Sequence, residues 1–288
     1  MKKNVFLIDA LPYVFRAYFA LPEMRSPRGD NVNAVYGFAR FLIKLLAEEK
    51  PSHVMVAFDE SLTTSFRNEF YPDYKANRAL PPPELEAQLK YCQRMAQALG
   101  CCVLADHRYE ADDLIATARH KLGKEKCAFV IVSGDKDLLQ LVDARTRYYN
   151  AAKHKWLDEM VVEKETGLRP QQIPDFLGLA GDSTDNISGV SGVGNKTAVA
   201  LLKGFQTLEN LYANLDLVRH MNLRGAATLA GKLREGKKIA QLSKRLATLS
   251  LEAPMRESLK TLVYKGANKK LALPLMEEFG FLKMIELL

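Results

Sequence analysis

The pattern of apolar and polar positions divides the chain into two parts. In the first part, short apolar runs that end in polar or turn residues predict β-strands at 4–9, 53–59, 101–105 and 128–135. Between them, the apolar residues of 33–49 and 84–100 recur at helical spacing. Strands that alternate with helices in this way are typical of a parallel sheet, so we expect an α/β fold.

After about residue 170 the strand pattern fades and helical spacing dominates. The predicted helices cover 171–180, 195–203, 207–213, 226–248 and 268–287, with Gly- and Asn-containing turns between them. We therefore expect an α/β domain at 1–170 and a helical domain at 171–288. One segment, 60–84, is too polar and too rich in proline for a core element. Long irregular segments in compact domains usually have a function or are disordered.

The overall composition is that of a soluble globular protein. Of the 288 residues, 48% are hydrophobic, which supports a sizeable core. No apolar run approaches the roughly 18 residues of a membrane helix, and Asp9 interrupts the N-terminal apolar run without a cleavage site after it. The four cysteines show no CxxC spacing, so neither a zinc site nor a disulfide framework is indicated. We expect a cytoplasmic protein with no membrane partner.

Acidic residues follow the predicted strands. Asp9, Asp59 and Asp135 each stand at or just beyond the carboxyl end of a strand. Ligands of open α/β sheets bind at this edge. A single aspartate in such a place is often a helix cap or a loop residue. Three of them at one edge favour a binding site.

Further acids accompany these three. Glu110, Asp112 and Asp113 open a predicted helix, where capping and the helix dipole are an alternative explanation for acidic residues. Asp137 follows two residues after Asp135, and on a helical turn Asp182 and Asp185 would share one face.

These nine acids imply a metal site if they converge. Like charges a few Å apart repel strongly, so cations must offset them. An all-oxygen ligand set without His or Cys favours Mg²⁺ or Mn²⁺, and two such ions can activate water for phosphodiester hydrolysis. Without the nine, 25 of the 34 acids remain against 41 Lys and Arg residues. This excess of basic residues favours a polyanionic partner such as nucleic acid.

Five ordered motifs carry a family resemblance. They are "LIDALPYVFRAY", "VAFDE" with "FRNEFYPDYKANR", "YEADD", "VSGDKDLLQLV" and "GDSTDNISGVSGVGNKTA". The chain resembles the 5′-nuclease family of flap endonucleases and 5′→3′ exonucleases, and most of all the N-terminal exonuclease domain of bacterial DNA polymerase I. The resemblance covers nearly the whole chain. It implies a PIN-like α/β nuclease domain followed by a helical part that contains a helix-three-turn-helix motif.

The resemblance also assigns the acids to two Mg²⁺ ions, for which Mn²⁺ can substitute. It implies that the first ion is held by Asp9, Asp59, Glu110, Asp112 and Asp135, with Asp113 close by. It implies that the second is surrounded by Asp135, Asp137, Asp182 and Asp185.

Segment 60–84 matches the arch over the active site of this family, and we call it the arch segment. Lys75 and Arg78 match the arch residues that steer the scissile phosphate, which gives them a catalytic role. The alternative is a pair of cations in a polar loop that simply faces solvent. Tyr74 is expected to stack on an unpaired base.

The stretch "GVSGVGNKTAVALL" matches the hairpin of the helix-three-turn-helix motif. Its glycines allow close approach of a phosphate strand, and amides at the following helix N-terminus bind phosphate without reading sequence. The expected DNA contacts are Gly189, Val190, Gly192, Gly194, Lys196 and Thr197, and the resemblance adds a K⁺ ion at the hairpin carbonyls. Alternatively, the glycine-rich turn only joins two helices. The basic stretch 232–245 either contacts duplex or is a solvated helix face.

The predicted function is a metal-dependent 5′→3′ deoxyribonuclease. It would act as a monomeric exonuclease or flap endonuclease on DNA with a 5′ end, a flap or a junction of single strand and duplex. Two alternatives are a non-catalytic DNA-binding module that retains the fold and a PIN-like ribonuclease. A complete nuclease and one domain of a polymerase both fit the sequence.

Overall fold

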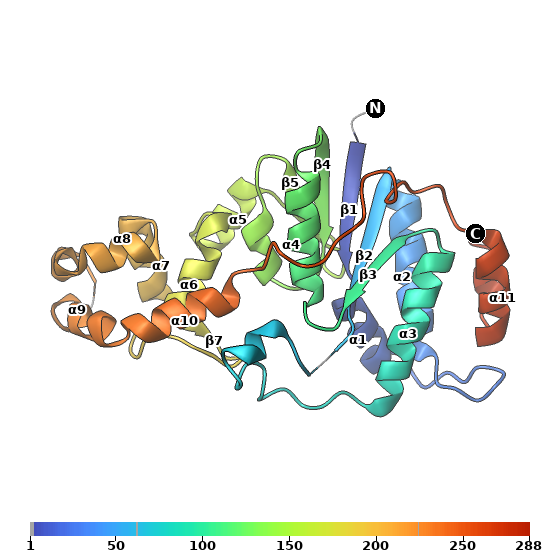
Figure 1. Ribbon diagram of the computed structural model, residues 1–288, viewed down its shortest axis with the longest axis horizontal. Helices are drawn as coiled ribbons and strands as arrows, with labels where there is room; N and C mark the ends of the chain where they lie inside the picture. Colours follow the sequence, from blue (N-terminus) through green and yellow to red (C-terminus); the bar gives the residue numbers. More distant parts are fainter. Residues whose placement is uncertain (1–2, 62, 224) are drawn as a thin grey trace.

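The computed structural model describes residues 3–61, 63–223 and 225–288 (Figure 1). Within these residues, the centre of the molecule is a six-stranded sheet with the order β3-β2-β1-β4-β5-β6. The strands are β1 (Lys3–Asp9), β2 (His53–Asp59), β3 (Cys102–Asp106), β4 (Cys127–Val132), β5 (Thr146–Asn150) and β6 (Lys155–Leu157). The first five run parallel, and β6 pairs antiparallel with β5.

All four predicted strands are present, and the predicted α/β fold is confirmed. The strands β5 and β6 were not predicted, because they are only five and three residues long, too short for a clear apolar pattern. Their pairing is supported across the two strands by Tyr149 and Trp156, whose rings stack with centroids 4.4 Å apart. Cross-strand aromatic pairs of this kind stabilise a sheet edge.

Helices cover both faces of the sheet because successive strand residues point to opposite sides. Phe6 and Ile8 pack with α1 (Leu11–Ala20), α2 (Asn33–Glu49) and α3 (Pro83–Ala98). Val5 and Leu7 pack on the other face with α4 (Ala111–Leu122). The arch segment runs from the end of β2 to α3 and includes the short 3-10 helix η1 (Phe66–Glu69). Its residue Leu62 lies outside the described residues.

The helical part has a core of its own at the left of Figure 1. After η2 (Asp137–Leu141), α5 (Glu159–Thr166) and η3 (Pro170–Gln172), it comprises α6 (Ile173–Ala180), α7 (Asn195–Phe205), α8 (Leu208–Ala213), η4 (Leu215–His220), α9 (Ala226–Glu235) and α10 (Lys237–Ala247). The helix predicted at 226–248 is two helices, separated at Gly236. After α6, a short antiparallel strand pair, β7 (Gly181–Asp182) and β8 (Ile187–Ser188), leads into the glycine-rich hairpin before α7.

The chain returns to the α/β part at its end, which corrects the expectation that 171–288 forms one helical domain. α11 (Lys269–Phe279) lies beside α3 at the opposite end of the molecule from α8 and α9 (Figure 1), and α12 (Leu282–Ile285) packs on α11. Met276, Phe279 and Met284 join the core formed by α2 and α3. Apolar spacing predicts that a helix buries one face, but it does not indicate which core receives that face.

Within the ranges that the structure describes, no helix combines the length and the apolar character that crossing a bilayer requires.

Candidate active site

A first group of acids lines a cavity at the carboxyl edge of the parallel strands. Asp9 ends β1, Asp59 ends β2, and Asp135 follows β4. Glu110 and Asp112 come from the start of α4, where Glu110 is the N-cap residue. The structure brings all five together around a cavity of about 530 Å³.

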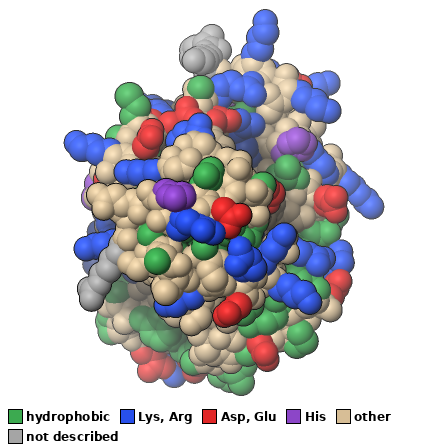
Figure 2. All heavy atoms as spheres, turned by 90° about the vertical axis from the view of Figure 1, so that its left-hand side faces the viewer, with side chains coloured by type: hydrophobic (Ala, Val, Ile, Leu, Met, Phe, Trp, Pro, Cys, Tyr) green, Lys and Arg blue, Asp and Glu red, His purple; other side chains and the backbone are tan. Residues whose placement is uncertain are grey.

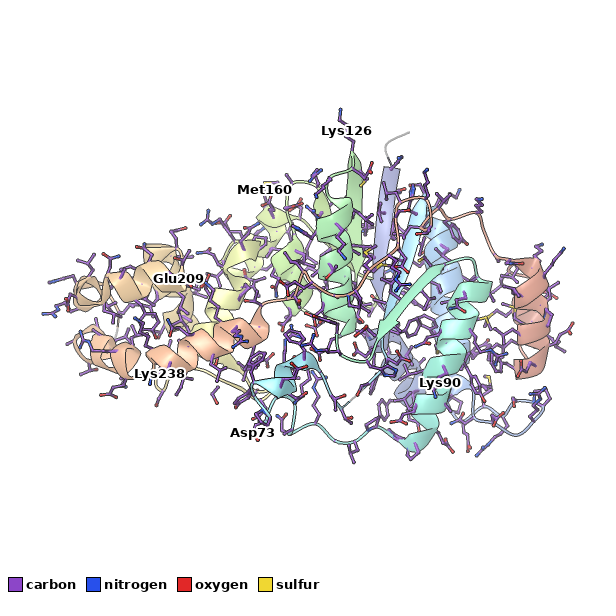
Figure 3. The ribbon with its side chains drawn as sticks, viewed as in Figure 1. Asp73, Lys90, Lys126, Met160, Glu209 and Lys238 are labelled. Carbon is purple, nitrogen blue, oxygen red and sulfur yellow. The ribbon has the colours of Figure 1, made fainter. Side chains whose placement is uncertain are left out.

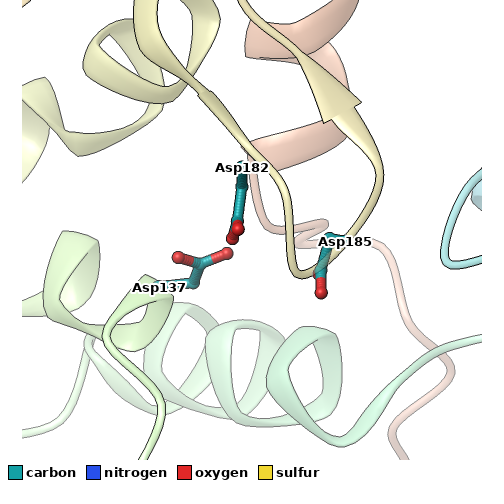
Figure 4. A group of neighbouring side chains, drawn as sticks. All are labelled: Asp137, Asp182 and Asp185. Carbon is teal, nitrogen blue, oxygen red and sulfur yellow. The ribbon is translucent and has the colours of Figure 1, made fainter. Parts of the chain in front are cut away.

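A second group lies beside the first. Asp137 begins η2, Asp182 ends β7, and Asp185 lies in the turn before β8. Figure 4 shows the carboxylates of Asp137 and Asp182 facing each other with Asp185 beside them, and one oxygen of each of the three lies within 4.8 Å of the others. The turn at 183–186, rather than the expected helical turn, brings Asp182 and Asp185 together. The second group lines a cavity of its own, of about 950 Å³. Asp135 lines both this cavity and the first one.

Burial and mutual repulsion raise the pKa of three of these acids. Burial, together with the carboxylates of Asp59 and Asp135, raises the pKa of Asp9 to about 8. Burial and the Glu110 carboxylate raise the pKa of Asp59 to about 7. Burial and the neighbouring Asp135 raise the pKa of Asp137 to about 8. A bound cation would therefore favour the ionised form of Asp9, Asp59 and Asp137 near neutral pH.

Two basic side chains of the arch segment point into the cleft. The ammonium group of Lys75 contacts Oε1 of Glu110 and lies 3.7 Å from Oδ2 of Asp185. The guanidinium group of Arg78 contacts Oδ1 of Asp185. The alternative of a solvent-facing pair is therefore wrong for Lys75, whose side chain is only 22% exposed.

Asp113 lies behind the cleft rather than in it. Its side chain is fully buried, and its two oxygens accept hydrogen bonds of 2.7 and 2.9 Å from Arg67. The amide of Ser250 donates a third bond of 2.8 Å. This corrects the expectation that Asp113 joins the metal ligands. Consecutive residues of a helix point about 100° apart, so Asp112 faces the cavity while Asp113 faces the core.

Tyr74 is buried as well, which corrects the expectation that its ring stacks on an unpaired base. Only 5% of the residue is exposed. Its hydroxyl contacts Oε2 of Glu110 at 3.1 Å and Oδ2 of Asp185 at 3.3 Å. Tyr74 thus bridges the two acidic groups from the arch side.

Ser133 and Arg67 were not identified from the sequence. The hydroxyl of Ser133 donates a 2.6 Å hydrogen bond to Oδ2 of Asp9 and accepts one of 2.9 Å from the amide of Asp135. It therefore orients two members of the first group. Its position in "VSGD", two residues before Asp135, was the available signal. Arg67 showed no such signal, because its partners come from distant parts of the chain.

The glycine-rich hairpin connects β8 to α7 and ends at the N-cap residue Gly194. Gly192, Gly194 and Lys196 are exposed, and Thr197 is partly exposed in the first turn of α7. Val190 is different: its side chain is buried, and its amide donates a 2.8 Å bond to the carbonyl of Leu179. The expected DNA contact of Val190 is therefore corrected to a core position.

The fold requires glycine at position 189 because another backbone segment passes very close to it. A Cβ atom there would lie 2.4 Å from the backbone carbonyl carbon of Ala180, so the end of α6 packs directly on the hairpin. This close approach holds the hairpin against the helical core.

The basic stretch 232–245 has two kinds of residue. Lys244 lies 2.6 Å from Asp175 and 2.8 Å from Glu209, so it joins α10 to α6 and α8. Lys232, Lys237 and Lys238 are exposed, and Figure 3 shows Lys238 on the outer side of α10. Figure 2 views this end of the molecule and shows Lys and Arg side chains over much of its surface.

Two family models match the chain. One describes a 5′-3′ exonuclease N-terminal resolvase-like domain and matches residues 4–167. The other describes a 5′-3′ exonuclease C-terminal SAM fold and matches residues 168–270.

Curated relatives agree with these models. The chain is 39% identical to DNA polymerase I of Bacillus caldotenax over 291 residues, which is 99% of this chain and 32% of that protein. It is 38% identical to a 5′-3′ exonuclease of Buchnera aphidicola over 253 residues, which is 87% of this chain and 83% of that protein. The chain thus spans about a third of the polymerase relatives and most of the exonuclease.

Solved structures show the same fold. The T5 5′-exonuclease with bound zinc aligns with a TM-score of 0.74 at 17% identity over 96% of this chain and 99% of that one. The catalytic core of Rad2 in complex with a DNA substrate aligns with a TM-score of 0.62 at 16% identity over 99% of this chain and 90% of that one.

The expected resemblance and the expected fold class, an α/β nuclease domain with a helical C-terminal part, are confirmed. The acidic cluster in turn indicates divalent-metal binding. Because the two models together match residues 4–270, the chain belongs to the 5′-3′ exonuclease family and contains both its resolvase-like and its SAM-fold domain.

Proposed function

We propose that this chain is a metal-dependent 5′→3′ exonuclease and flap endonuclease of DNA. Its substrates are DNA ends, flaps and junctions of single strand and duplex with a free 5′ terminus. One observation carries the proposal: two acidic groups share Asp135 in a cleft that the basic residues of the arch segment enter. Family membership and the DNA substrate in the Rad2 complex support the choice of DNA.

The donor set fits two Mg²⁺ ions, with Mn²⁺ as a substitute. All the available side-chain donors are carboxylate oxygens, and hard divalent cations prefer such ligands. The first ion would be held by Asp9, Asp59, Glu110, Asp112 and Asp135, and the second by Asp135, Asp137, Asp182 and Asp185. When bound, such ions make water a stronger nucleophile and stabilise the leaving oxygen.

Lys75 and Arg78 bind and orient the scissile phosphate in this proposal. Both lie at the acidic groups, paired with Glu110 and Asp185. Cations bound by those carboxylates would release the two basic groups from their ion pairs. A phosphate placed between the acidic groups is then within reach of both side chains, and their positive charges offset the charge that develops on it.

The hairpin grips the duplex farther from the cut. The exposed amides at the start of α7, with Lys196 and Thr197, bind a backbone phosphate and do not read sequence. A K⁺ ion at the hairpin carbonyls belongs to the same proposal, as does action by a monomer. The exposed lysines of α9 and α10 lie on the same helical part and extend its basic surface.

A labelled flap substrate tests this function. A DNA flap carrying a 5′ label is digested with Mg²⁺ or with EDTA, and the product lengths are measured. We expect short labelled products only with Mg²⁺. Binding without cleavage would favour the non-catalytic module, and faster cleavage of a matched RNA flap would favour the ribonuclease.

A further inference from the structure

Arg67 is an arginine in the interior, at the base of the arch segment. It lies on η1 and is only 1% exposed. Burying a guanidinium group is costly unless each N–H finds an acceptor. Here all of them do: Nε binds the carbonyl of Leu246, Nη1 binds Glu110 and Asp113, and Nη2 binds Asp113 and the carbonyl of Thr248.

These partners come from two different parts of the fold. Glu110 and Asp113 belong to the first turn of α4 in the α/β part. Leu246 lies in the last turn of α10, and Thr248 is its C-cap residue. A cation at the end of a helix is favoured by the exposed carbonyls there. Arg67 therefore joins the arch segment to the acid-bearing end of α4 and to the helical part.

The contact with Glu110 bears on the active site. Nη1 of Arg67 lies 2.9 Å from Oε2 of Glu110 and 2.7 Å from Oδ2 of Asp113. Asp113 holds the guanidinium group with both of its oxygens, a geometry that fixes the plane of an arginine. The anchored arginine in turn fixes one oxygen of Glu110, while the other oxygen, Oε1, faces Lys75.

We propose that Arg67 is a positioning residue of the active site, anchored by Asp113 and by the end of α10, which orients the Glu110 carboxylate and places the arch segment over the cleft. The role of the cleft itself rests on the proposed function. Arg67 does not line the cleft and touches no substrate in this role. It acts through Glu110, in the way that outer partners of metal ligands tune affinity.

Arg67→Lys is the informative variant. It keeps the positive charge but loses the planar guanidinium group, so it cannot donate hydrogen bonds to Asp113, Glu110 and two carbonyls at the same time. We expect the Mn²⁺ concentration for half-saturation to rise about tenfold, as is typical when an outer partner of a ligand is lost. The Mg²⁺ concentration for half-maximal flap cleavage should rise in parallel. Metal binding is followed by Mn²⁺ electron paramagnetic resonance, which requires no turnover.

A matched control is Arg108→Lys. Arg108 also pairs with a carboxylate of η1, at 2.7 Å from Glu69, but on the surface, with 54% of its side chain exposed. Because exposed ion pairs contribute little, this variant should bind Mn²⁺ as the wild type does. Asp113→Asn weakens the ion pair that anchors Arg67, and it should raise the Mn²⁺ concentration for half-saturation as Arg67→Lys does. In a Glu110→Gln background, Arg67→Lys should add little further change.

The outcomes separate the two proposals. Normal half-saturation in Arg67→Lys and Asp113→Asn, with only a lower Tm, would show that Arg67 is purely structural. Additive effects of Arg67→Lys and Glu110→Gln would also overturn the inference. If Arg67→Lys does not fold, Asp113→Asn decides by the same measurement. A wild-type protein that binds Mn²⁺ without cutting any flap would contradict the proposed activity instead.

Discussion

The amide of Asp137 donates a 2.9 Å hydrogen bond to Oδ1 of Asp135. This bond ties the first residue of η2, in the second acidic group, to the acid that lines both cavities. The two groups therefore form one continuous site. A change at Asp135 should affect both of its parts.

Asp135→Asn should reduce cleavage by on the order of a thousandfold or more, because both metal positions lose a negative ligand. DNA binding should remain, since the glycine-rich hairpin and the exposed lysines of α9 and α10 are unchanged. Flap cleavage in Mg²⁺ and gel-shift binding in Ca²⁺ measure the two effects. Asp30→Asn, at an exposed position away from the cleft, is the control. Unchanged turnover of the Asp135 variant would refute the metal assignment.

Lys75→Ala should lower the cleavage rate at saturating DNA by about 10²- to 10³-fold, the usual cost of removing one charge-stabilising group. Duplex affinity should change little, because Lys75 faces the cleft. Single-turnover kinetics with excess enzyme separate these quantities. Lys153→Ala, at an exposed turn, serves as the comparison. A loss confined to DNA affinity would argue against phosphate steering.

The stability of the metal-free protein should fall as the pH rises from 6 to 8. The pKa values of Asp9, Asp59 and Asp137 are raised to about 8, 7 and 8, above the value near 4 in an unfolded chain. The folded state thus binds more protons in this window, and stability is lost as they dissociate. The pKa of Glu110 is lowered from its ordinary value of 4.5, so this group changes the stability only at more acidic pH and does not oppose the trend.

Thermal unfolding in EDTA at pH 6 and pH 8 measures this effect, and added Mg²⁺ should reduce the difference. Asp137→Asn removes one of the raised acids and should increase the Tm in EDTA at pH 8. A Tm that stays constant or rises between pH 6 and 8 in EDTA would contradict the electrostatic account.

Gly192→Ala should weaken duplex binding about tenfold, roughly 1.4 kcal/mol. Gly192 has a φ of +78°, and an added Cβ would lie 2.8 Å from Nζ of Lys232. A non-glycine residue in this left-handed region costs about 1–2 kcal/mol, so the hairpin should shift. Fluorescence anisotropy with a labelled duplex measures the affinity.

Gly231→Ala is the matched control for the hairpin. It lies within α9, and an added Cβ there meets no atom within 4 Å. Alanine favours a helix over glycine, so this variant should be slightly more stable and bind duplex normally. Equal binding by the Gly192 variant would show that the hairpin does not hold DNA.

The sequence by itself determined the local elements and the chemistry of the site. Apolar periodicity located β1 to β4, because strand and helix spacing is a short-range property. The position of Asp9, Asp59 and Asp135 at strand ends placed them at one edge, because parallel strands share that edge. The ordered motifs also led to the correct family.

Only the tertiary structure decided which neighbours share a surface. Asp112 faces the cleft and Asp113 the interior, because the rotation of α4 against the sheet is set by packing along its whole length. Tyr74 and Arg67 are buried by contacts with residues 36 to 181 positions away, which no local pattern encodes. For the same reason, the return of α11 to the first core was visible only in the fold.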